Sequence, residues 1–401
     1  MSRISRRHFL QFAGSTCATL GLSQLSLPQQ AERYGKVLAQ STPRKVALLV
    51  GINNYPDLPL RGCLTDVELQ RHLLIHRFGF NPKDIYTLTD AQATRDGILA
   101  AFEEYLIKQA KPGDVVVYHY SGHGSRVLDP DPIVVELDEQ NTGLNGTFVP
   151  IDADLSSEQV KQGAVVKDIM GHTLFLLMSA VKSENFTAVL DSCYSGGAVR
   201  ERTIRARDGG QKVQISPAEK AYQEQWLSRL KLSRAEFVRR YREGVAKGVV
   251  LAATDPYQTA IDATIERGKL YAGAFTYLLT QYLWENDSTP EDAIASIIPE
   301  IPEDYNQTPG CKAKFGSGYE KQPIYFTKTP RPIANAVITA VDVNSATLWL
   351  GGVELETVGN GTVFAVMNST AKVTLRSRNG LVGTGTATGS VKPGALLQQL
   401  N

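Results

Sequence analysis

The segment 115–124, VVVYHYSGHG, is an apolar run that breaks into a polar turn flanked by glycine. A second segment of the same build, 186–197, reads FTAVLDSCYSGG. Short runs of branched apolar residues that end in Gly and Ser are typical of buried strands followed by tight turns. The carboxyl ends of parallel strands meet at one edge of an open sheet, and ligands bind there. If the two strands are neighbours, His123 and Cys193 face the same crevice.

A thiol beside an imidazole is the pair that nucleophilic attack on a carbonyl needs. The thiolate attacks, and an imidazole that titrates near neutral pH takes its proton and later protonates the leaving amine. The backbone N–H groups of Cys193 and Gly124 are the candidates for the oxyanion hole. Taken singly, a strand-end Cys is often an inert buried thiol and a Gly-flanked His a turn residue. His119 and His123, with no third ligand nearby, do not favour a metal site.

Apolar runs alternate with helical stretches on both sides of these turns. The predicted strands are 46–52, 84–88, 114–120, 186–191, 248–253 and 323–326. The predicted helices are 65–78, 94–110, 165–181 and 272–284, with Thr65 and Thr94 as predicted caps. This alternation predicts an α/β fold with an open, mostly parallel six-stranded sheet and helices on both faces. Short alternating runs past Pro330 predict a small C-terminal all-β module at 335–401.

Composition limits the classes of function. The 401 residues suffice for a catalytic domain with an accessory module. Lys and Arg number 42 against 41 Asp and Glu, so no nucleic-acid partner is expected. The four cysteines are Cys17, Cys63, Cys193 and Cys311, and three remain if a leader carrying Cys17 is removed. An odd number leaves at least one thiol unpaired, and whether Cys63 and Cys311 pair stays open.

Residues 1–39 are typical of an export signal. An Arg pair, Arg6 and Arg7, precedes Phe9 and a mildly apolar stretch at 12–27 that is shorter than a membrane span. We therefore expect a twin-arginine signal and export to the periplasm or an equivalent extracytoplasmic compartment. After its removal we expect a monomer with no stable membrane insertion. An ordinary basic terminus is the alternative.

The two glycine-flanked turns together resemble the catalytic signature of the caspase-like peptidases, and specifically of the metacaspase branch, whose prokaryotic members are also called orthocaspases. The segments 60–67, 251–255 and 273–276 resemble the same family, so that the resemblance spans about 45–328. It implies a caspase-like peptidase domain with a large-subunit-like part at 45–200, an exposed linker at 200–247 and a small-subunit-like part at 248–328. It also implies a cysteine endopeptidase that needs no organic cofactor, with Cys193 as nucleophile and His123 as general base and acid.

The resemblance further implies an acidic pocket for the residue before the scissile bond. The matching positions are Asp66, Asp191 and Ser121. Two carboxylates in a partly dry pocket would bind a guanidinium by charge-assisted hydrogen bonds and repel an Asp side chain. Protein or peptide substrates with Arg or Lys are therefore the expected partners. As alternatives, Asp66 stabilises the first turn of a helix, and Asp191 is a turn residue at a strand end.

Calcium-dependent members of the family suggest a further set of acidic residues. Asp138, Glu139, Asp152 and Asp154 are the candidate calcium ligands. Arg200 stands where the resemblance leads one to expect the ligand that follows the Cys, and a solvated acidic loop explains the same four residues. We therefore expect no metal to be required for the chemistry.

Four arginines crowd the segment that follows the candidate nucleophile. They are Arg200, Arg202, Arg205 and Arg207. An enzyme that cuts after Arg would process itself there, whereas a disordered basic loop would be cut by other proteases.

Two other functions stay open at this point. One is a non-catalytic caspase-like scaffold that binds protein partners, and the other is a further Arg- or Asn-specific peptidase of the same fold, clostripain-like or legumain-like.

Overall fold

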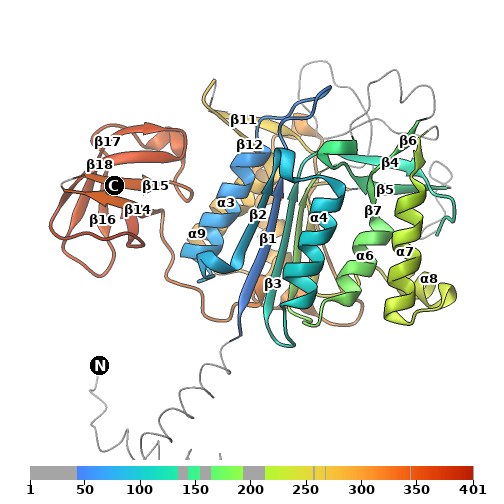
Figure 1. Cartoon of the computed structure of the whole chain (residues 1–401). Helices are drawn as coiled ribbons and strands as arrows, with labels where there is room; N and C mark the ends of the chain where they lie inside the picture. Colours follow the sequence, from blue (N-terminus) through green and yellow to red (C-terminus); the bar gives the residue numbers. More distant parts are fainter. Residues whose placement is uncertain are drawn as a thin grey trace, which may run out of the picture. The chain divides into compact units, whose positions relative to one another are not determined.

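The central sheet has six strands in the order β13-β10-β8-β3-β1-β2 (Figure 1). They are β1 (Lys45–Gly51), β2 (Ile85–Thr89), β3 (Val115–Ser121), β8 (Phe186–Asp191), β10 (Val249–Ala252) and β13 (Gly310–Ala313). This computed structural model describes residues 43–133, 143–153, 164–192, 213–255, 258–266, 268–343 and 345–400. Only the edge strand β13 pairs antiparallel, so the predicted mostly parallel sheet is confirmed.

The sixth strand of the sheet is not the one predicted. Residues 323–326 were expected to be extended, but Ile324–Phe326 form a 3₁₀ turn, in which Tyr325 and Phe326 have φ angles of 50° and 49°. Left-handed backbone of this kind cannot continue a strand. The edge position belongs instead to β13, whose sequence GCKA has no apolar run. Edge strands are often short and polar, so the hydrophobic pattern gave no signal for it.

Helices cover both faces of the sheet, as predicted (Figure 1). The strand pleat sends alternate side chains to opposite faces. In β3, Val115 and Val117 pack into one apolar core, while Val116 and Tyr118 pack into another. The first core includes side chains of α3 (Cys63–His76), α9 (Ala274–Glu285) and α10 (Pro290–Ile297). The second includes those of α4 (Arg95–Ala101), the π-helix η3 (Phe102–Lys108) and α6 (Gly171–Ala180).

Helix starts were predicted with mixed success. Thr94 caps α4 by accepting a hydrogen bond from the Gly97 N–H, as expected. The predicted cap Thr65 is wrong, because α3 begins at Cys63 after Gly62. The Gly62 N–H instead donates to Oδ1 of Asp262, at 2.9 Å, from a strand 200 positions further along the chain. Helix α6 begins at Gly171 rather than 165, since two short strands occupy the preceding residues.

A second sheet begins just after the end of β3. Its order is β6-β9-β4-β5-β7, and its strands are β4 (Gly124–Leu128), β5 (Leu144–Phe148), β6 (Val165–Val166), β7 (Ile169–Met170) and β9 (Gln214–Ile215). A separate hairpin, β11 (Asp262–Glu266) and β12 (Leu270–Gly273), leads into α9. Strand β4 starts directly after His123, so this sheet fixes one side of the turn that carries the histidine.

Part of the expected exposed linker at 200–247 is folded. Residues 193–212 lie outside the described residues, but α7 (Pro217–Leu230) and α8 (Arg234–Arg242) are well-formed helices. Trp226 and Phe237 are buried among the side chains of the second core. The charged surface of both helices suggested an exposed excursion, whereas the apolar side chains of each helix pack against the core.

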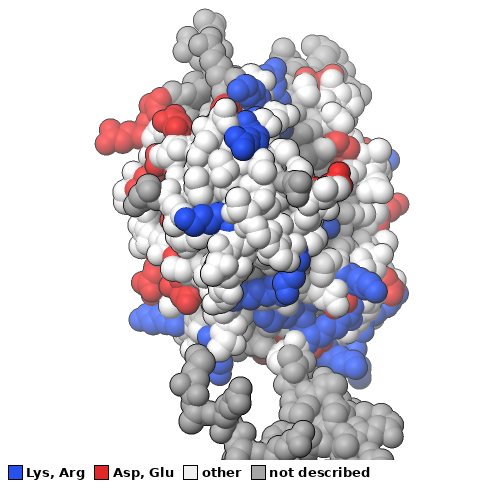
Figure 2. Space-filling model, turned by 90° about the vertical axis from the view of Figure 1, so that its left-hand side faces the viewer, with Lys and Arg blue, Asp and Glu red and all other residues white. Residues whose placement is uncertain are grey.

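The C-terminal module is a closed barrel of six strands, which confirms the predicted all-β module. In barrel order the strands are β14 (Ala336–Asp342), β15 (Ser345–Trp349), β18 (Val382–Thr388), β17 (Lys372–Asn379), β16 (Val363–Val366) and β19 (Leu396–Gln399). Seen from its barrel side, the molecule presents mostly uncharged residues at the centre, with Asp and Glu along the two side edges (Figure 2). Among the described residues, none of the helices combines the length and apolar character that a membrane span requires.

Two histidines of α3 form a stack beneath the barrel. The ring of His72 lies 4.1 Å from that of Trp349 and 5.5 Å from that of His76, centroid to centroid. Burial is the main cause that lowers the pKa of His72 to about 3 and that of His76 to about 4, with Arg71 and Arg331 adding to it. Glu68, 3.6 Å from His72, is the acidic group on this face of the helix. The stack therefore favours neutral imidazoles.

We expect this stack to make the protein sensitive to acid. A folded-state pKa below the unfolded value of about 6.5 means that stability is complete above pH 6.5 and is lost as the pH falls toward the folded pKa. For His72 the slope approaches about 1.4 kcal/mol per pH unit. Urea unfolding at pH 7, 5.5 and 4.5 measures it, and His72→Phe, which keeps the stack but cannot be protonated, should flatten the dependence. Equal slopes for the two proteins would contradict the assignment.

Candidate active site

The imidazole of His123 is held in one tautomer. His123 lies in the turn between β3 and β4 and is 3% exposed. Its Nε2 is 2.7 Å from the carbonyl oxygen of Leu58, in the loop between β1 and α3. A carbonyl oxygen only accepts, so Nε2 carries the proton and Nδ1 keeps its lone pair. Nδ1 is therefore the atom able to take a proton from a nucleophile.

Two tyrosines hold the backbone around this histidine. The Tyr55 hydroxyl accepts a hydrogen bond from the His123 N–H at 3.1 Å and donates to the carbonyl of Val149 at 2.8 Å. Its ring lies 4.5 Å from the imidazole, centroid to centroid. The Tyr120 hydroxyl lies 2.9 Å from the carbonyl of His123. Burial, above all, raises the pKa of Tyr120 well above its ordinary value, so this hydroxyl stays a donor.

Sequence reasoning missed Tyr55. The residue follows β1, whose carboxyl end lies at the same edge of the sheet as that of β3, because Gly51 pairs with Ser121. That position was a usable signal. A rule that inspects every loop at this edge would have included residues 53–60 as well as the two glycine-flanked turns.

Ser121, Asp66 and Asp191, predicted to bind substrate, lie together at the edge of the sheet. Ser121 pairs with Asp191 across β3 and β8. Its hydroxyl donates to Oδ2 of Asp66 at 2.7 Å, and the Gly273 N–H donates to Oδ1 of the same carboxylate at 2.9 Å. Oδ2 of Asp191 accepts hydrogen bonds from the N–H and the hydroxyl of Thr276, at 3.1 and 2.6 Å. All three predicted residues are fully buried.

Both carboxylates therefore join two parts of the domain. Asp66 is in the first turn of α3, yet its carboxylate accepts hydrogen bonds from Ser121 and Gly273. Its contacts therefore extend beyond its own helix. Asp191 likewise bonds to the first turn of α9 rather than only to its own turn. The arrangement concentrates two carboxylates where β3, β8, β12 and α9 meet.

Cys193 lies outside the described residues, and the chain can be followed as far as Ser192, which is 3% exposed. Ser121 and Asp191 are aligned on adjacent parallel strands. His123 and Cys193 each stand two positions beyond one of these paired residues. The Gly122 N–H donates to the carbonyl of Asp191 at 3.3 Å, so the two strands are still joined where they end. Gly124, the candidate oxyanion donor, opens β4 and is buried.

In the described part of the chain, the remaining candidate residues do not form a metal site. Asp138, Glu139 and Asp154 lie outside it, as do Arg200, Arg202, Arg205 and Arg207. Asp152 accepts a hydrogen bond from the Arg95 N–H at 2.7 Å and lies 3.6 Å from the Lys167 ammonium. His119 is buried within β3. Among the described residues, no group of three His, Cys, Asp or Glu is placed to hold a metal ion. No disulfide joins Cys63 to Cys311.

Comparison with known proteins finds a similarity to residues 45–201. Residues 45–201 match the family model described as "Metacaspase, peptidase C14 domain". Metacaspase-1 of Meyerozyma guilliermondii is 34% identical over 180 residues, which are 42% of this chain and 40% of that protein. Metacaspase-1 of Cryptococcus neoformans is 30% identical over 203 residues, 45% of this chain and 42% of that protein. The chain thus spans about two fifths of the length of these relatives.

A solved structure, that of protein GSU0716 from Geobacter sulfurreducens, aligns with 71% of this chain and 99% of its own at 19% identity and a TM-score of 0.49. Metacaspase-1B of Aspergillus clavatus is 33% identical over 190 residues, 43% of this chain and 42% of that protein. The matched segment contains β1, β3, β8 and both glycine-flanked turns. Residues 45–201 therefore match a metacaspase-type peptidase C14 domain and are similar to these curated metacaspases.

Proposed function

We propose that this protein is a cysteine endopeptidase in which Cys193 and His123 cleave the peptide bond after an Arg, and also after a Lys. The observation that carries the proposal is the hydrogen bond from Nε2 of His123 to the Leu58 carbonyl, because it leaves Nδ1 as the proton acceptor at the end of β3. The neighbouring strand β8 leads directly to Cys193. The match of 45–201 to the metacaspase peptidase family supports the same chemistry.

The reaction follows from these groups. Nδ1 of His123 takes the Cys193 proton, and the thiolate attacks the carbonyl carbon of the substrate. The N–H groups of Gly124 and Cys193 would hold the oxyanion that forms. The C–N bond then breaks as His123 gives its proton to the leaving amine, and a water molecule hydrolyses the thioester with His123 again as base. No metal or organic cofactor enters these steps, and we propose that calcium is dispensable for them.

Preference for a basic residue is supported by charge. Asp66 and Asp191 place two carboxylates at the carboxyl edge of the sheet, and Ser121 adds a hydroxyl. A guanidinium reaching this region would gain charge-assisted hydrogen bonds, whereas a substrate carboxylate would be repelled.

Short fluorogenic peptides that end in Arg, Lys, Asp or Asn test this specificity. We expect kcat/KM for Arg to exceed that for Asp by roughly 100-fold or more, since like charges in a binding site cost several kcal/mol. The Arg peptide should be cleaved equally with calcium and with a chelator, and Cys193→Ala protein should cleave none of the peptides. A preference for Asp or Asn would show that Asp66 and Asp191 do not form a pocket for a basic residue.

We also propose that the protein processes itself at Arg200, Arg202, Arg205 or Arg207. These arginines follow the candidate nucleophile within a short stretch of sequence. Purified unaltered protein should give fragments that end at one of these residues, and Cys193→Ala protein should stay intact under the same conditions. Identical fragments from both proteins, measured by mass spectrometry, would assign the cuts to other proteases.

Export by the twin-arginine route is a further proposal. It is supported by the Arg6-Arg7 pair and the apolar stretch at 12–27. Because this route carries folded proteins, the parallel sheet and the barrel would form before export.

A further inference from the structure

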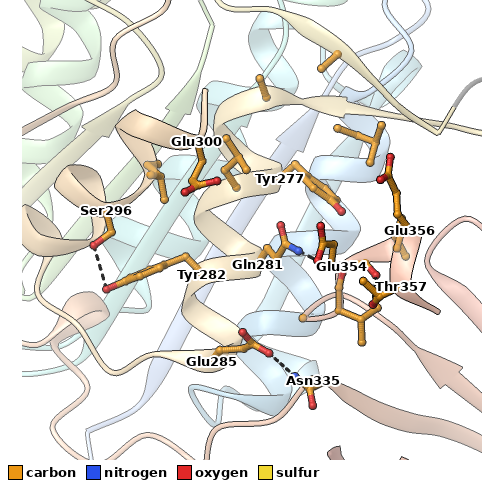
Figure 3. A pocket seen from close by; sticks show the side chains of 18 of the residues that line it. Tyr277, Gln281, Tyr282, Glu285, Ser296, Glu300, Asn335, Glu354, Glu356 and Thr357 are labelled. Carbon is orange, nitrogen blue, oxygen red and sulfur yellow. Dashed lines mark hydrogen bonds between the residues drawn. The ribbon is translucent and has the colours of Figure 1, made fainter. Parts of the chain in front are cut away.

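A cavity of about 1020 Å³ lies between α9 and the C-terminal barrel (Figure 3). One wall is the face of α9 that points away from the central sheet, with Tyr277, Gln281 and Glu285. The opposite wall is the loop after β15, which contributes Glu354 and Glu356. The close-up shows the side chains of Tyr277, Gln281 and Glu354 gathered at the centre (Figure 3). A cavity of this size is at the upper end of the usual range for ligand sites, about 300–1,000 Å³.

Direct contacts fix the two walls to each other. The Gln281 side-chain amide donates to the carbonyl of Val353 at 3.2 Å, and the Asn335 amide donates to Glu285. Trp284 lies on the buried side of α9 and packs closely under the loop. A Cβ atom added to Gly352 would lie 2.6 Å from the Cβ of Trp284. The cavity is thus bounded by contacts from both modules.

Charge distinguishes this cavity. Its lining includes four glutamates, Glu285, Glu300, Glu354 and Glu356, and no Lys or Arg. Among the described residues, no Lys, Arg or His lies within ion-pair distance of any of the four. Nearby Glu266, by contrast, pairs with Arg378 at 2.6 Å and Lys269 at 3.0 Å. Burial is the main cause that raises the pKa of Tyr277 to about 12, and the charge of Glu354 adds to it while that of Arg378 opposes it.

The arrangement suits an extended organic cation better than a metal ion. In the described part of the chain, no three acidic groups come close enough to hold a metal. The carboxylates stand instead on three separate segments, α9, the 3₁₀ turn Ile298–Glu300 and the loop after β15. Tyr277, Tyr282 and Tyr305 also line the cavity, and tyrosine rings attract guanidinium and ammonium groups. Spaced carboxylates with aromatic rings match a peptide that carries several basic side chains.

We propose that this cavity binds an extended peptide segment of a partner protein through its Lys and Arg side chains. The site goes beyond the proposed cleavage and does not depend on it, although the two are neighbours. Ala274 lines the cavity, and the preceding residue, Gly273, donates its N–H to Asp66.

Binding of a fluorescent twelve-residue peptide with alternating Lys and Arg tests the proposal. Full-length Cys193→Ala protein is used, so that the peptide is not cut and a failure of the proposed peptidase activity cannot affect the result. We expect Glu354→Gln with Glu356→Gln to raise Kd roughly fivefold by fluorescence anisotropy, since each exposed charge pair contributes modestly. Adding Glu300→Gln, which lies on another segment, to this double variant should raise Kd further. Glu224→Gln, an exposed change on α7, is the matched control and should leave Kd unaltered.

Two further measurements test the role of charge. A peptide with Gln in place of every Lys and Arg should bind at least about tenfold more weakly. Added salt should raise the Kd of the basic peptide. Equal Kd for the Glu354→Gln, Glu356→Gln protein and the Glu224→Gln control would overturn the proposal, as would equal binding of the basic peptide and its Gln counterpart.

Discussion

Replacing His123 with Ala lowers kcat/KM for an Arg-ended peptide by roughly 10⁴-fold, and Cys193→Ala lowers it at least as far. The expected diagnostic is the double variant, which should be hardly worse than either single one. Residues that act as one unit are strongly non-additive, because removal of the base leaves the nucleophile unactivated. Initial rates with the fluorogenic peptide, on proteins whose unfolding temperatures agree, provide the measurement.

The control for this experiment is a histidine outside the site. His72→Phe changes an imidazole that is stacked on Trp349, and it should leave kcat/KM within about twofold. If His123→Ala kept a tenth of the activity, or if the effects of the two single changes multiplied, His123 would not be the partner of Cys193. KM should change little, since the imidazole acts mainly in the transition state.

The parts of the fold that were predictable are those set by local sequence. β1, β3 and β8 are continuous apolar runs, since a central strand is buried on both faces, and their ends were placed within a residue or two. Because parallel strands end at one edge, the convergence of Ser121 with Asp191 followed from the topology. Thr94 capped its helix for an equally local reason.

The parts that could not be predicted depend on distant partners or on backbone atoms. The Leu58 carbonyl orients His123, yet every residue has a carbonyl, so no residue type marks it. The Asp66 carboxylate meets the Gly273 N–H across 207 positions of sequence. The start of α3 is likewise determined by Asp262 and not by the Thr65 beside it. Such contacts appear only once the sheet has brought the two halves together.

Helix α7 carries a buried ion pair of the kind that composition alone does not reveal. Glu219 is fully buried, and its Oε2 lies 2.5 Å from the guanidinium of Arg95 on α4. Its Oε1 accepts hydrogen bonds from the Met170 N–H, at 2.9 Å, and from the Thr173 hydroxyl. The carboxylate therefore accepts from donors on both of its oxygens. It joins the segment after the candidate cleavage sites to α4 and α6.

Glu219→Gln should lower the free energy of unfolding by roughly 3–5 kcal/mol. The NH₂ group of the Gln amide would face one of the donors, and Arg95 loses its buried counter-charge, so that among the described residues its remaining acidic partner is the exposed Asp96 at 3.3 Å. Urea unfolding measures the loss. Glu236→Gln on α8, which breaks the exposed pair with Arg240, is the matched control and should cost less than about 1 kcal/mol.

A paired replacement separates the charge from the packing. Arg95→Met with Glu219→Leu removes both ions and fills the space with apolar side chains, so most of the stability lost in Glu219→Gln should return. If the paired variant is as unstable as the single one, the hydrogen bonds to Met170 and Thr173 hold α7 in place and the ion pair does not. If Glu219→Gln and Glu236→Gln lose the same stability, the buried ion pair does not stabilise the protein, and the apolar side chains of α7, Trp226 among them, hold the helix to the core.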